Sequence, residues 1–205
     1  MGDKNSIRIS VELQGEKLTA LAAILESVFP VKFDFALQCD ASYAGAIVAA
    51  GPSLPAPPDN SAKTCQMILP RPLAGNSPGP AAEIRVRFSD DARVPFPFRG
   101  RPLSCKVGGR PEPLKLIAGE KALLTCERGV LWTQSEVRGV TVFRSALSLP
   151  EIPAQGNLHD VLNGDRFLEL LPVLHFLRTV TGHYQWQRPP VRAQFMFDDP
   201  NLHWP

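Results

Sequence analysis

Alternation of apolar and polar residues predicts a first strand over residues 7–13, IRISVEL. The next segment, KLTALAAILESVF, predicts an amphipathic helix, because its apolar residues recur at helical spacing. Pro30 ends this helix, and VKFDFAL alternates again from Val31. The wholly apolar run AGAIVAAGP that follows predicts a strand buried on both faces of a sheet.

Strands connected by a helix favour a parallel sheet, so the fold class predicted for the chain is α/β. The second half of this domain is richer in strands, with candidates at CQMILP, EIRVRF, ALLTCE, VLWTQ and VTVFRSAL. Gly129, between two of these candidates, predicts a hairpin. Many of the 21 prolines lie between Gly51 and Pro80, where they predict long irregular connections.

A second helical region covers residues 157–182, NLHDVLNGDRFLELLPVLHFLRTVTG. Asp165 is its candidate N-cap and Gly182 its candidate stop. Pro172 leaves two alternatives, a kinked helix or a second helix that begins there. Residues 191–197 then predict a new strand. The predicted divisions are an α/β accessory domain (1–149), a helical linker (150–190) and the start of another domain (191–205).

The composition is that of a soluble globular protein, with 44% apolar and 20% charged residues. A net charge of +2 gives no strong field for nucleic acid or for an anionic membrane, and neither is expected as a partner. The sequence shows no signal peptide and no membrane-spanning run, which predicts a cytoplasmic location. Cysteine spacing fits no zinc ribbon and no redox pair, so we interpret the cysteines as reduced, mostly buried thiols (Cys39, Cys65, Cys105 and Cys126).

The first domain shows no catalytic motif. Ser53, after the buried strand, lacks the G-x-S-x-G context of a nucleophile and is interpreted as a turn residue. The opening strand–helix–strand pattern, the AIVAAGPS segment and the late hairpin resemble a class I glutamine-amidotransferase-like, flavodoxin-like domain over residues 7–147. That family's nucleophilic cysteine motif is missing, and Cys126 in LTCERG is interpreted as a packing residue. The resemblance implies a non-catalytic relative that binds, gates or supports something else.

Candidate chemistry lies in the tail, where the predicted strand runs into Asp198 and Asp199. Two adjacent acids can divide the work, one holding a divalent metal and the other taking a proton from the metal-bound water. Imidazoles normally complete a zinc site of this kind. The alternative is a plain turn, because Asp-Pro-Asn is good turn chemistry. A second acid pair, Asp90 and Asp91, is interpreted as a turn.

The stretch FMFDDPNLHWP and the preceding residues from Leu149 resemble the first motif and linker of the polysaccharide deacetylase superfamily (carbohydrate esterase family 4-like). The resemblance implies that Asp198 is the general base and that Asp199 ligates Zn²⁺ or a similar divalent metal. His203 and Trp204 become candidate substrate or metal contacts. The family's later H-x-x-x-H ligands are missing from the chain, and Pro200 replaces the usual glycine.

These observations predict the N-terminal part of a bacterial deacetylase-like protein, with the first strand of a barrel-like domain at its end. In the full protein, a metal-dependent reaction would remove acetyl groups from a carbohydrate substrate. The chain itself is expected to be inactive and to bind no metal tightly. The alternative hypothesis is a non-catalytic α/β binding or regulatory module whose tail is a docking strand.

Overall fold

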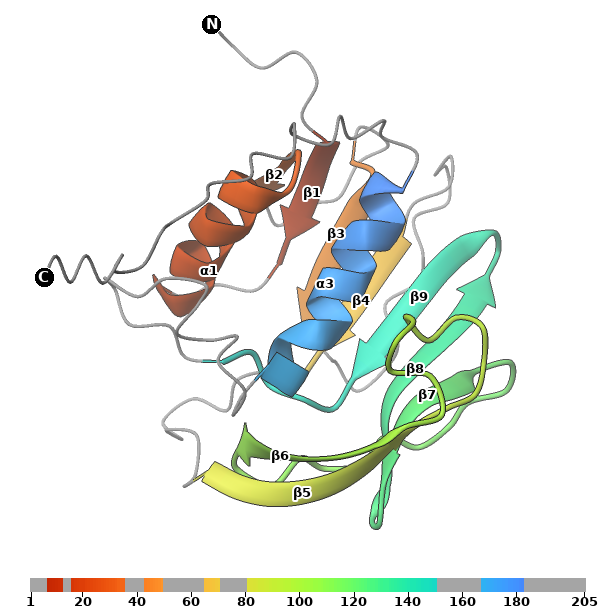
Figure 1. Cartoon of the computed structure of the whole chain (residues 1–205). Helices are drawn as coiled ribbons and strands as arrows, with labels where there is room; N and C mark the ends of the chain where they lie inside the picture. The colour runs from red at the N-terminus through yellow and green to blue at the C-terminus, as the bar shows by residue number, and fades with distance from the viewer. Residues whose placement is uncertain are drawn as a thin grey trace, which may run out of the picture.

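A nine-stranded mixed sheet with two helices makes up the computed structural model, which describes residues 7–12, 16–35, 43–49, 65–70, 81–150 and 167–182 (Figure 1). The described elements, in chain order, are β1 (Ile7–Val11), α1 (Glu16–Val28), β2 (Val31–Asp34), β3 (Gly45–Ala49), β4 (Cys65–Leu69), β5 (Ala81–Phe88), β6 (Pro102–Gly108), β7 (Lys121–Cys126), β8 (Gly129–Val137), β9 (Val140–Ser145) and α3 (Phe167–Thr181).

The strand order is β2-β1-β3-β4-β9-β8-β7-β5-β6. All neighbours from β2 to β9 pair in parallel, and all neighbours from β9 to β6 pair antiparallel. The sheet is therefore divided at β9 into a parallel half and an antiparallel half. This mixed architecture confirms the predicted α/β class.

Both helices cover the same face of the sheet (Figure 1). Successive side chains of a strand point to opposite faces, so Phe143 of β9 faces α3 while Arg144 faces away from it. Side chains of α1, α3 and the facing strands form one buried cluster, which continues into the antiparallel half. Gly45 permits close approach of α3 to β3, because a Cβ there would lie 2.9 Å from Phe176 Cζ.

Each edge strand of the sheet has a backbone N–H bound by a glutamate from a helix. Glu26 of α1 accepts a hydrogen bond from Phe33 N of β2 at 2.7 Å. Glu169 of α3, which is 1% exposed, accepts one from Gly108 N of β6 at 2.6 Å. Unpaired edge groups invite another strand to add, and these carboxylates block that at one position on each edge.

The first predicted helix, the part of the second helical region from Phe167, and the predicted strands within the described residues are confirmed. The hairpin predicted at Gly129 joins β7 to β8, and β3 is buried along nearly its whole length. Pro172 lies inside a single helix, α3, which continues through it. The predicted cap Asp165 lies outside the described residues. Side chains of α3 belong to the core of the sheet, while the predicted domain divisions remain predictions.

One strand, β6, was missed. Its sequence, PLSCKVG, begins with proline and ends with glycine, both of which argue against a strand. Its alternation is nevertheless regular, with Leu103, Cys105 and Val107 directed inward and Ser104 and Lys106 exposed or nearly so. Pairing with β5 along its full length supplies the stabilisation that its own composition lacks.

Candidate functional site

The residues predicted to carry chemistry lie outside the part of the chain that the structure describes. This holds for Asp198, Asp199, His203 and Trp204 in the tail. Ser53, which was interpreted as a turn residue, also lies outside the described residues. The predicted first strand of a barrel-like domain and the docking-strand alternative fall in the same undescribed tail. The turn interpretation of the other acid pair is confirmed, since Asp91 Oδ1 accepts a hydrogen bond from Arg93 N at 2.9 Å.

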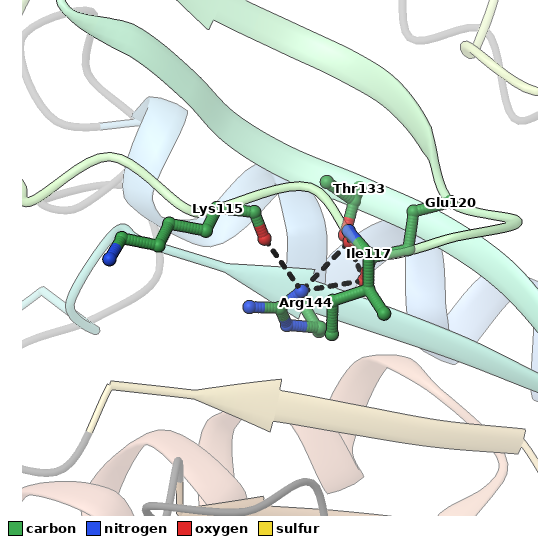
Figure 2. Close-up of polar contacts among 5 residues, drawn as sticks. All are labelled: Lys115, Ile117, Glu120, Thr133 and Arg144. Carbon is green, nitrogen blue, oxygen red and sulfur yellow. Dashed lines mark hydrogen bonds and ion pairs between the residues drawn. The ribbon is translucent and has the colours of Figure 1, made fainter.

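A largely buried ion pair between Arg144 and Glu120 lies on the sheet face opposite α3 (Figure 2). Arg144 Nη1 lies 2.8 Å from both carboxylate oxygens of Glu120. The carboxylate also accepts hydrogen bonds from Ile117 N at 2.9 Å and from Thr133 Oγ1 at 3.2 Å. The side chain of Glu120 is 4% exposed and that of Arg144 is 15% exposed. Charged groups this deeply buried need such partners, and here both have them.

This ion pair anchors the connection between β6 and β7, residues 109–120, which we call the clamped loop. Leu114 forms an isolated antiparallel bridge with Val130 of β8, and the N–H of Leu114 donates a hydrogen bond to Val130 O at 2.7 Å. Lys115 O accepts a hydrogen bond from Arg144 Nη1 at 3.3 Å. The loop thus crosses β8, reaches β9 and returns to the start of β7, held at several points (Figure 2).

The tip of the clamped loop, residues 116–119, presents apolar side chains to solvent. Leu116 is 52% exposed and Ile117 is 42% exposed. Gly119 has a φ of +86°, which lets the chain turn back so that Glu120 N donates to Ile117 O at 3.1 Å. The tip thus exposes two adjacent aliphatic side chains on a loop that hydrogen bonds hold against the sheet, and loops held on a scaffold often carry binding residues.

Two of the described thiols, Cys65 and Cys105, are poorly suited to nucleophilic chemistry. Burial raises the pKa of the Cys65 thiol to about 12. Burial, with the carboxylate of Glu169 nearby, raises the pKa of the Cys105 thiol to about 11. The thiolate is the reactive form, and it is scarce at neutral pH when the pKa is this high. Both residues, and the half-buried Cys126, are free cysteines, and Cys39 lies outside the described residues.

His175 of α3 packs between two aromatic rings of the sheet. Its ring centroid lies 5.2 Å from those of Trp132 and Phe143, both in edge-to-face geometry. Nδ1 is buried without a hydrogen-bond partner. Burial, with a smaller contribution from the charge of Arg178, lowers the pKa of His175 to about 4. These contacts are those of a histidine that packs in the core.

One internal cavity in the described part of the molecule is small and lined by apolar residues. A cavity of about 10 Å³ lies between α1, the sheet and α3, lined by residues such as Val11, Leu25 and Val173. It has room for roughly one water molecule, so it holds no substrate.

Within the described ranges, no group of three His, Cys, Asp or Glu side chains could hold a metal ion. None of the described helices is long and apolar enough to span a membrane.

No family model matches the chain, and no curated protein matches it either. Among solved structures, the chain is similar to a putative GMP synthase subunit from Thermoplasma acidophilum, with a TM-score of 0.49 and 12% identity. The similarity covers 86% of this chain and 95% of the other.

The expected membership of the polysaccharide deacetylase superfamily was therefore wrong. No comparison finds a deacetylase, and the structural neighbour bears the name of a different protein. The expected deacetylation of a carbohydrate rested on that membership and is therefore also wrong. The general-base and metal-ligand roles of Asp198 and Asp199 were implied by the same resemblance, and these two residues lie outside the described part of the chain, so their roles stay predictions.

Proposed function

We propose that the described part of the chain is a non-catalytic binding module with a flavodoxin-like parallel half. The strand order supports this arrangement, since β2-β1-β3-β4-β9 follows the 2-1-3-4-5 order of flavodoxin-like sheets. The antiparallel half extends that sheet and carries the clamped loop. The raised pKa values of Cys65 and Cys105 support a role other than nucleophilic catalysis.

The binding element in this proposal is the tip of the clamped loop, and its target is another protein. One observation carries the proposal: the buried carboxylate of Glu120 fixes the loop while Leu116 and Ile117 stay exposed. A loop already held in its bound conformation loses little conformational entropy when it binds. Burying the two aliphatic side chains against a partner then contributes to affinity directly.

Site-specific photocrosslinking tests this function. A benzoylphenylalanine residue would replace Leu116 in one variant and, as a control, Val28 of α1 in another, since Val28 is similarly exposed at 53%. The expected result in host cells is a discrete crosslinked protein at position 116 and none at position 28. Glu120→Gln, which removes the charge that Arg144 holds, should weaken the crosslink in a chain that circular dichroism shows to be folded. Identical products from both positions would contradict the proposal.

A further inference from the structure

We draw no further inference here: the strongest candidate, the side-chain cluster between β8 and α3 in which Trp132 Nε1, Gln134 Oε1 and His175 Nδ1 are buried without hydrogen-bond partners, carries nothing, because the small cavity among the described residues is lined by other side chains and nothing in the part of the chain that the structure describes shows what would bind to these atoms.

Discussion

Replacing Arg144 by methionine should destabilise the fold strongly, because it leaves the carboxylate of Glu120 buried without its cation. Removing one member of a buried ion pair costs about 3–5 kcal/mol. The lower end, about 3 kcal/mol, is expected here for two reasons. Arg144 is still 15% exposed, and Glu120 keeps its hydrogen bonds from Ile117 N and Thr133 Oγ1.

Urea denaturation followed by circular dichroism measures this effect. With a slope of about 1–3 kcal/mol per molar urea, a loss of about 3 kcal/mol lowers the midpoint by roughly 1 M or more. The matched control is Lys32→Met, which breaks a pair with Glu26 of the same 2.8 Å length. That pair is 60% and 22% exposed, so the midpoint should hardly move.

A double variant separates the buried charge from the loss of packing. Adding Glu120→Gln to Arg144→Met removes the unpaired charge, so part of the lost stability should return. A midpoint for Arg144→Met no lower than that of Lys32→Met would refute the view that Glu120 and Arg144 fix the clamped loop. So would a double variant that is less stable than Arg144→Met alone.

Three further predictions concern the side of the sheet covered by helices. The pKa of His175, lowered from 6.5 to about 4, means that stability is complete above pH 6.5 and falls towards pH 4. His175→Phe should make the urea midpoint less dependent on pH over that window. An equal dependence of the midpoint on pH in the variant and in the original chain would contradict this. Iodoacetamide with peptide mapping should leave Cys65 and Cys105 unlabelled in the folded chain, and rapid labelling would be inconsistent with their raised pKa values. Gly45→Ala should cost about 1–3 kcal/mol by crowding Phe176, and an unchanged melting temperature would disprove that.

The periodicity of apolar residues predicted those helices and strands whose burial is visible in their own sequence. The helix α1 and the strand β3 were found because apolar spacing reports burial directly. The strand β6 was missed because its stability comes from pairing with β5, which local composition does not report. Pro172 left two alternatives open, because the packing of α3 on the sheet decides between them.

The clamped loop could be predicted only in part. Its prolines and Gly119 indicate an irregular segment, and Leu116 with Ile117 is visible as an apolar pair. The contact between Glu120 and Arg144 joins residues 24 positions apart, and nothing in either segment identifies the other as its partner. The adjacent acids of the tail, in contrast, form a local pattern that is visible in the sequence alone.

The two glutamates at the sheet edges limit the ways in which this protein can form larger assemblies. A sheet lengthens when a new strand finds open backbone groups, and Glu26 and Glu169 already occupy the amides of Phe33 and Gly108. A second copy or a neighbouring domain that aligned a strand there would have to displace a carboxylate first. Strand addition at those two positions is therefore disfavoured. Association through side-chain contacts is favoured over the formation of a continuous intermolecular sheet.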